Sequence, residues 1–432
     1  MRRETEIPPS YRAGDLLVDG HVREVIREGK PVPLNPLAFR VLYRLVQRRG
    51  NIILKNEFEP RRDQYHEGRN PVDLHVMELR KQLGKGIITT VHSRGYRLSP
   101  DYLVESIPCP SLSALEKKLT LALNEVKAHR SSSLAGVINR YEELCKANKI
   151  AEAYPLIVLA YINLGHVGMA RLLHKETISM AREIISEAPN MGSTFALRGL
   201  TYLIYEYNWK QAEEDLNLAP RLSPQNELAH CFLGILQVAQ GRFEEGLAHA
   251  RTAADVDYES PMTVVTEPWL MHFAGRVVEA VRLGQEVVNN FPDFAPARHL
   301  LGDFYCAAGA PDQAIPHYEK SIEIDFLPAT VASLGFVYGR KRDRKNALRQ
   351  LARLKEALLD KKIAYFSGYY EALVRAGLRE KARCMDALER AFEERCDWLI
   401  YLAVEPRWKE MRGERRFQNL LSRVCLQQLH WD

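Results

Sequence analysis

The first hundred residues alternate between short apolar stretches, turn signals and two amphipathic helices. Between residues 14 and 32, short apolar runs are separated by Asp19-Gly20 and by a second turn signal at residues 28–30, which predicts short strands. Asn35 followed by Pro36 is typical of a helix start. The helix that follows buries apolar residues at helical spacing: Ala38, Val41, Leu42, Leu45 and Val46. Gly50 ends this helix, and residues 51–56 predict a short apolar strand.

A second helix and a hairpin are predicted further along the same region. Residues 59–69 are polar, and Pro60 excludes a long helix there. Asn70 and Pro71 again predict a helix start, and Asp73 is placed to meet the free amides of the first turn. One apolar stripe follows, made of Val72, Val76, Leu79 and Leu83. Residues 87–98 then predict two strands around a turn at residues 93–95.

The rest of the chain is predicted to be helical and repetitive. Residues 100–112 contain three prolines and predict a linker. Beyond them, Gly241, Gly275 and Gly309 stand 34 residues apart. A second series has steps of 34, 34, 34 and 33 residues: Ala212, Gly246, Ala280, Ala314 and Ala347. A 34-residue unit with small residues at two fixed points resembles the tetratricopeptide repeat, in which paired helices cross closely. We expect six or seven units within residues 113–425, closed by a capping helix near the C-terminus.

Charge is concentrated near the N-terminus, which favours a nucleic-acid-binding domain there. The net charge is +5 overall, but residues 1–100 carry 19 Lys or Arg and 12 Asp or Glu. A basic module joined to a near-neutral body is typical of such an arrangement. The seven cysteines form no C-x-x-C pair and the thirteen histidines show no metal spacing, so we expect neither a disulfide framework nor a metal site.

The ordered motifs of residues 10–99 resemble an OmpR/PhoB-type winged-helix DNA-binding domain. The resemblance rests on the run VDLHVMELRKQLG followed by IITTVHSRGYRL, preceded in order by GKPVPLNPLAF and RRGNIILKNEF. It implies a fold that is mainly α overall: an α+β winged helix-turn-helix domain followed by an α-helical tetratricopeptide solenoid. It also implies that the helix beginning near Asn70 is a recognition helix, which enters the DNA major groove.

Residues off the apolar stripe of that helix are the candidates for reading DNA. Arg80 is the best candidate because a guanidinium can bond both O6 and N7 of guanine. The full set of predicted base contacts is His75, Met77, Glu78, Arg80 and, at the wing tip, Arg94. Predicted phosphate contacts are Arg69, Lys81 and Arg97. Each of these residues could instead be an ordinary surface charge, and Glu78 could form a salt bridge.

No catalytic or cofactor motif is found, so we expect a non-enzymatic protein without a cofactor. The sequence contains no G-x-x-x-x-G-K-[ST], H-E-x-x-H or G-x-S-x-G motif. About ten residues precede the winged helix, so we expect no phosphoacceptor domain. The lack of a signal peptide and of a membrane span predicts a cytoplasmic protein.

Two functions remain open from the sequence. One is a bacterial transcription regulator, and the alternative is a protein-interaction scaffold whose basic head does not bind specific DNA. For the regulator, the expected partners are double-stranded DNA, RNA polymerase through residues 59–69, and a protein or peptide bound by the repeat array. A homodimer is a further expectation. Aromatic residues of the array are interpreted as core rather than as a ligand platform: Tyr202, Tyr205, Trp209, Trp269 and Tyr338.

Overall fold

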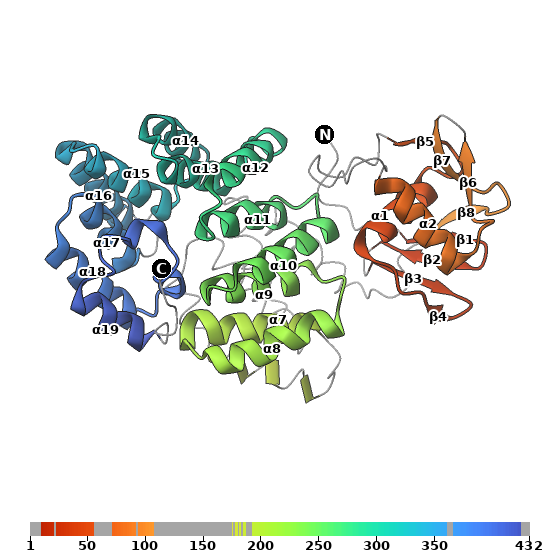
Figure 1. Ribbon diagram of the computed structural model, residues 1–432, viewed down its shortest axis with the longest axis horizontal. Coiled ribbons are helices and arrows are strands. Elements are labelled where there is room, and N and C mark those ends of the chain that lie inside the picture. Colours follow the sequence, from red (N-terminus) through yellow and green to blue (C-terminus); the bar gives the residue numbers. More distant parts are fainter. Residues whose placement is uncertain are drawn as a thin grey trace. The chain divides into compact units, whose positions relative to one another are not determined.

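The computed structural model describes residues 10–20, 23–55, 71–91, 94–107, 192–360 and 366–424, with seven further positions between 175 and 186. The chain divides into two compact units, residues 1–121 and 122–432 (Figure 1). None of the described helices is long and apolar enough to cross a lipid bilayer.

In the part of the first unit that the structure describes, two helices pack against two antiparallel sheets. The larger sheet has the strand order β4-β3-β2-β1-β8 and the smaller one β5-β7-β6. The strands of the larger sheet are β1 (Ser10–Ala13), β2 (Leu16–Asp19), β3 (Glu24–Arg27), β4 (Lys30–Pro31) and β8 (Val104–Ile107). Those of the smaller sheet are β5 (Ile53–Leu54), β6 (Ile88–Val91) and β7 (Gly95–Leu98). The predicted strands before residue 32 and the predicted hairpin are therefore present.

The two predicted helices are also present, and their apolar faces form the core of this unit. Helix α1 (Pro36–Gln47) begins as predicted, because the side chain of Asn35 accepts a hydrogen bond from the amide of Ala38 at 2.8 Å. Helix α2 is Pro71–Leu83. All nine residues of the two predicted apolar stripes are buried: Ala38, Val41, Leu42, Leu45, Val46, Val72, Val76, Leu79 and Leu83. Residues 56–70, Asn70 among them, lie outside the described residues.

The structure differs from the prediction over the expected linker of residues 100–112. Within that stretch, β8 pairs antiparallel with β1, from Ser10 opposite Ile107 to Ala13 opposite Val104. Four residues that we predicted to connect the units are thus the edge strand of the first unit. The pairing partner, β1, is itself a strand that the sequence pattern did not predict, since it precedes Gly14.

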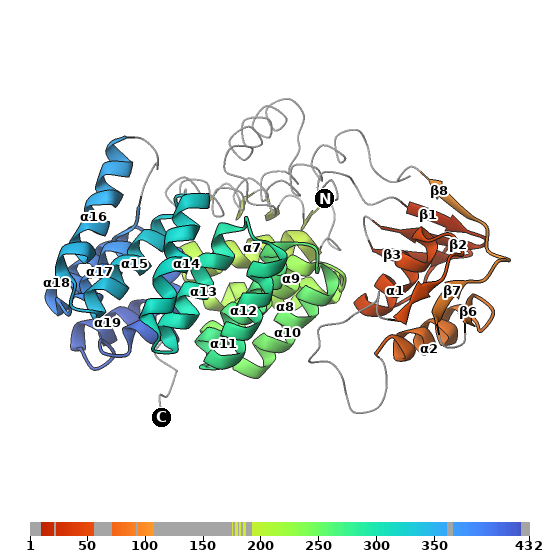
Figure 2. The same cartoon turned by 90° about the horizontal axis from the view of Figure 1, so that it is seen from above.

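The second unit is an arc of antiparallel helix pairs (Figures 1 and 2). The first helices of the six described pairs are α7 (Gly192–Thr201), α9 (Glu227–Ala239), α11 (Pro261–Phe273), α13 (Ala295–Ala307), α15 (Pro328–Arg340) and α17 (Gly368–Gly377). The second helices are α8 (Trp209–Leu222), α10 (Phe243–Val256), α12 (Val277–Asn290), α14 (Pro311–Ile324), α16 (Arg344–Leu359) and α18 (Lys381–Glu393). From α8 to α16, successive second helices begin 34, 34, 34 and 33 residues apart. This confirms the predicted period.

The two series of small residues have distinct structural reasons. The series from Ala212 to Ala347 lies in the second helices, where it is buried between the paired helices. The other series lies two residues before each second helix, in the left-handed conformation: φ is +78° at Gly241, +74° at Gly275 and +73° at Gly309. The same place is taken by Arg342 with φ of +63° and by Arg379 with φ of +60°. A left-handed residue at this turn is thus required in these units, whether or not it is glycine.

These turns allow a matched pair of stability predictions. Gly275→Ala is expected to lower the free energy of unfolding by about 1–2 kcal/mol, because a Cβ is disfavoured in the left-handed region. Arg342→Gly relieves that strain but adds freedom to the unfolded chain, so we expect a change below about 1 kcal/mol, in the stabilising direction. Urea unfolding followed by circular dichroism measures both. Equal destabilisation by the two variants would contradict this explanation of the turn.

Candidate nucleic-acid interface and the inner face of the array

Helix α2 is positioned by polar contacts at both of its ends. Near its start, the carboxylate of Asp73 accepts a hydrogen bond from the Tyr96 hydroxyl at 2.6 Å, and Lys55 Nζ lies 2.8 Å away. Burial would raise the pKa of Asp73, but these two hydrogen bonds outweigh it and lower that pKa. At the other end, Arg27 donates to the carbonyl oxygen of Leu83 at 2.7 Å. A cation at this end also stabilises the helix dipole.

The hairpin of β6 and β7 is fixed to β5 by a close backbone approach at Gly95. A Cβ at this position would lie 2.0 Å from the carbonyl oxygen of Ile53. Any larger residue would therefore push β7 away from β5. These two strands pair with each other, with Ile53 opposite Tyr96. The G-Y-R run of the predicted wing thus has a structural reason for its glycine.

The exposed face of α2 is opposite its buried stripe. Met77 is 63% exposed and Leu74 is 43% exposed, and the side chains of Lys81 and Gln82 are also exposed. Arg94 is exposed in the turn between β6 and β7. Of the predicted contacts, Met77, Lys81 and Arg94 are therefore open to solvent. Leu74 was not predicted, although its place one turn before Met77 and Glu78 puts it on the same side of the helix.

The other predicted contacts are partly buried and held within the domain. Arg80 donates to the carbonyl oxygen of Ile88 at 2.8 Å and to the hydroxyl of Thr90 at 2.7 Å, so its guanidinium lies against β6. The carboxylate of Glu78 accepts a hydrogen bond from the side-chain amide of Asn35. Burial lowers the pKa of His75.

Of the two remaining predicted phosphate contacts, the structure describes Arg97 but not Arg69. Arg97 lies on β7 and is half-buried, and its Nε has no hydrogen-bond partner in the described chain. Arg69 lies outside the described residues. The structure thus brings Met77 and Lys81 together on one free helix face, while Glu78 and Arg80 are committed to contacts inside the domain.

The inner side of the repeat array is occupied by the chain's own C-terminal segment, which we define as residues 396–424. Its ribbon lies inside the arc formed by the helix pairs (Figure 1). The segment contains the 3-10 turns η4 (Asp397–Tyr401) and η5 (Pro406–Trp408), and it ends in α19 (Arg415–Arg423). Helix α19 packs on α18. The preceding part was not predicted to return into the arc.

Aromatic stacking and hydrogen bonds bind this segment to helices far away in the sequence. Tyr401 stacks on Phe273 of α11, with ring centroids 4.8 Å apart. Tyr207 donates to the carbonyl oxygen of Cys396 at 2.9 Å, and Trp209 donates to that of Val424 at 2.6 Å. Among the aromatics interpreted as core, Tyr202 and Tyr205 are fully buried, whereas Trp209, Trp269 and Tyr338 are half-buried.

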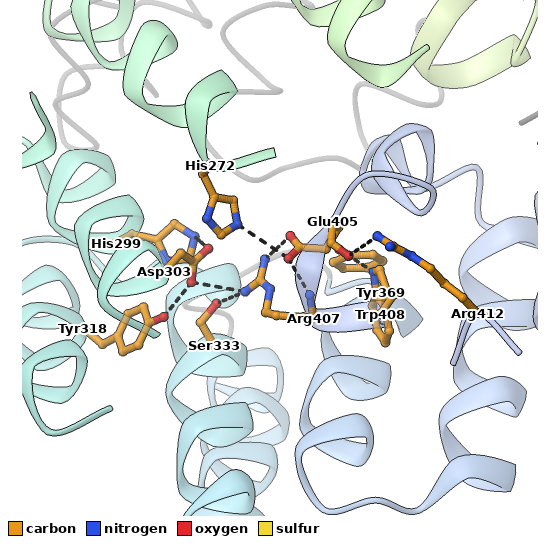
Figure 3. Close-up of polar contacts among 10 residues, drawn as sticks. All are labelled: His272, His299, Asp303, Tyr318, Ser333, Tyr369, Glu405, Arg407, Trp408 and Arg412. Atoms are coloured by element: carbon orange, nitrogen blue, oxygen red, sulfur yellow. Dashed lines mark hydrogen bonds and ion pairs between the residues drawn. The ribbon is translucent and has the colours of Figure 1, made fainter. Parts of the chain in front are cut away.

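A buried ionic cluster holds the middle of the segment (Figure 3). The Arg407 guanidinium, 8% exposed, donates to Glu405 at 2.7 Å, to Ser333 at 2.7 Å and to Asp303 at 3.2 Å. Asp303 also accepts a hydrogen bond from Tyr318 at 2.6 Å. Burial disfavours the charge of Arg407, but the carboxylates of Asp303 and Glu405 raise its pKa well above the ordinary value. The cluster therefore joins α13 and α15 to the C-terminal segment through paired charges.

Part of the chain is similar to known transcriptional regulatory proteins. The family model of "Transcriptional regulatory protein, C terminal" matches residues 29–98. Transcriptional regulatory protein CseB of Streptomyces coelicolor is 37% identical over 87 residues, which cover 20% of this chain and 37% of CseB. Transcriptional regulatory protein QseB of Escherichia coli O157:H7 is 33% identical over 101 residues, which cover 23% of this chain and 46% of QseB. The chain thus spans less than half the length of these curated relatives.

Two solved structures match parts of the chain at low sequence identity. The APC/C hetero-tetramer Cut9-Hcn1 matches at 17% identity and a TM-score of 0.47, covering 73% of this chain and 57% of that one. A tetratricopeptide repeat protein from Parabacteroides merdae matches at 14% identity and a TM-score of 0.42, covering 61% and 99%. The assignment of the repeat rests on the 34-residue spacing of the helix pairs. Residues 29–98 therefore resemble the C-terminal domain of OmpR/PhoB-type transcriptional regulatory proteins, and helix pairs with the 34-residue tetratricopeptide spacing follow them in the same chain.

Proposed function

We propose that the protein is a sequence-specific DNA-binding transcriptional regulator, in which the exposed face of α2 enters the major groove. The observation that carries this proposal is the division of α2 into a fully buried apolar stripe and an open face with Met77 and Lys81. A helix of this kind fits the major groove, where its outer side chains meet base edges. We expect Arg94, which is exposed in the turn between β6 and β7, to contact the adjacent minor groove or its phosphates.

A footprint with purified full-length protein tests this proposal. A regulator protects a defined site in the presence of excess competitor DNA, and its binding weakens steeply as salt rises, because bound phosphates release counterions. A scaffold that does not bind specific DNA protects no site when competitor DNA is in excess.

One specific observation favours the scaffold. Hydrogen bonds hold Glu78 and Arg80 within the domain, and they occupy two groups that we predicted to read bases.

The roles of Arg80 and Lys81 can be separated by variants at these neighbouring positions. We propose that Arg80 acts through the hairpin, because its guanidinium bonds Ile88 and Thr90. Arg80→Ala is then expected to weaken binding by a similar factor at every base-pair variant of the site. A loss of about 1–3 kcal/mol confined to one base pair would instead show that Arg80 reads a base.

Lys81→Ala is expected to reduce the slope of log affinity against log salt by about one.

The array is proposed to bind a protein or a signal, on faces other than its inner side. The C-terminal segment covers the inner side through contacts to Tyr207, Phe273 and Asp303. A peptide that used the inner side would have to displace this segment. Contact with RNA polymerase through residues 59–69 and formation of a homodimer remain predictions, and residues 59–69 lie outside the described residues.

A further inference from the structure

A small cavity lies in the array where the C-terminal segment meets α15 and the start of α18. Its volume is about 220 Å³. Four of the residues that line it are cationic, namely Arg340, Arg379, Lys381 and Arg407, whereas Glu410 is the one carboxylate among them. The carboxylates that pair with these cations, Glu410, Glu414, Asp303 and Glu405, equal them in number, but the last three are not part of the lining. The charged groups that face the cavity are thus mainly cationic, which favours an anion there.

The cations of this cavity are only partly neutralised by the protein. Arg340 pairs with Glu410 at 2.7 Å, and Lys381 pairs with Glu414 at 2.5 Å. Both pairs are substantially exposed, so they are weak and exchange readily with another anion. The Arg379 guanidinium is exposed and has no hydrogen-bond or ion-pair partner within the part of the chain that the structure describes.

Arg407 contributes a buried cation to the same cavity. Its Nη atoms donate to Asp303, Ser333 and Glu405, but its buried Nε has no hydrogen-bond partner in the described chain. A buried N–H without a partner is costly and is uncommon in folded proteins. An acceptor in the cavity that reached this group would satisfy it.

The remaining walls are apolar and limit the size of the ligand. Phe336, Ala376 and Met411 supply them. The volume is below the roughly 300–1,000 Å³ of pockets for drug-sized molecules, so the ligand is a small one. Guanidinium groups bond planar carboxylates in a bidentate manner. We propose that this cavity binds a small organic dicarboxylate, with its carboxylates on the arginines and its carbon chain against the apolar wall.

Occupation of the cavity has a mechanical consequence. Arg340 lies on α15 and Arg379 on the turn before α18, whereas Arg407 and Met411 belong to the C-terminal segment. A dianion between them bridges the segment to the array. The carboxylates of the bound dianion also compete with the carboxylate of Glu410 for the guanidinium of Arg340. The site therefore couples a small acidic metabolite to the docked state of the segment, which goes beyond the proposed binding of DNA.

Isothermal titration of the full-length chain tests this inference with three probes: succinate, butyrate and inorganic phosphate. Succinate and butyrate have equal carbon counts but two carboxylates and one, respectively. We expect saturable binding of succinate, at least about tenfold tighter than that of butyrate or phosphate. No saturable heat from succinate at about 10 mM would overturn the proposal. Phosphate binding as tightly as succinate would overturn it too, because the site would then accept any dianion.

Three variants locate the binding. Arg379→Gly removes a cation at a left-handed position and is expected to weaken succinate binding about tenfold. Arg342→Gly makes the same change at the equivalent turn of the preceding repeat, outside the cavity, and is expected to leave affinity unchanged. Glu410→Gln removes the competing carboxylate and is expected to tighten binding. Equal losses in the two glycine variants, or weaker binding by Glu410→Gln, would contradict the assigned site. DNA binding is not measured here, so failure of this inference is distinct from failure of the regulator proposal.

Discussion

Arg407→Ala is expected to lower the free energy of unfolding of the repeat array by about 3–5 kcal/mol. The reason is that the variant leaves the carboxylates of Asp303 and Glu405 without their buried cation; these residues are only 4% and 1% exposed. Burial alone would raise the pKa of Glu405, but Arg407 and His272 outweigh it and hold that pKa well below its ordinary value. A buried charge that loses its partner costs far more than the pair contributes.

The measurement is urea unfolding of the full chain, followed by the fluorescence of its tryptophans. Trp398 and Trp408 belong to the C-terminal segment, so its release is expected to change the signal. Arg416→Ala is the matched control, because Arg416 also pairs with two carboxylates, Asp386 and Glu389, but is 46% exposed. That variant is expected to cost about 1 kcal/mol or less. Similar losses in both variants would contradict a structural role of the buried cluster.

Met77→Glu is expected to weaken DNA binding by at least about a hundredfold, since like charges brought together at an interface cost several kcal/mol. Met77 is 63% exposed on α2, so the substitution leaves the core of the domain unchanged. In the proposed complex the new carboxylate would face the phosphates and base edges of the duplex.

Leu103→Glu is the control for Met77→Glu. Leu103 is 81% exposed in the same unit but lies outside α2, between β7 and β8. The Leu103→Glu variant adds the same charge to the domain as Met77→Glu. We expect it to change the affinity for DNA less than about tenfold, through the long-range electrostatic field of the domain alone. Fluorescence anisotropy with a labelled duplex measures both. Equal losses would show that total charge, rather than the face of α2, controls binding.

The helices and the repeat could be predicted because they depend on local periodicity. The stripe from Val72 to Leu83 repeats every three or four residues, and the turn glycines repeat every 34. The first pattern is visible within a single helix, and the second is visible between equivalent positions of successive repeats. The buried stripes of α1 and α2 and the spacing of the second helices were confirmed on this basis.

The contacts of the C-terminal segment and of the candidate base readers could not be predicted in this way. Arg407 pairs with Asp303 across 104 residues, and no periodicity relates the two positions. A signal was nevertheless present, because residues 398–404 are seven consecutive apolar residues outside the repeat, as expected of a buried segment. The commitment of Arg80 to Ile88 depends on how the hairpin folds back onto α2, which helical spacing alone does not contain.

Protection of guanine N7 against methylation tests the central claim most directly. N7 lies in the major groove, whereas adenine N3 lies in the minor groove, so methylation by dimethyl sulfate distinguishes the two. With the full chain bound at a footprinted site, the account predicts protection of guanine N7 within the site and loss of this protection with Met77→Glu. A protected site in which every guanine N7 stays fully reactive would contradict the insertion of α2 into the major groove.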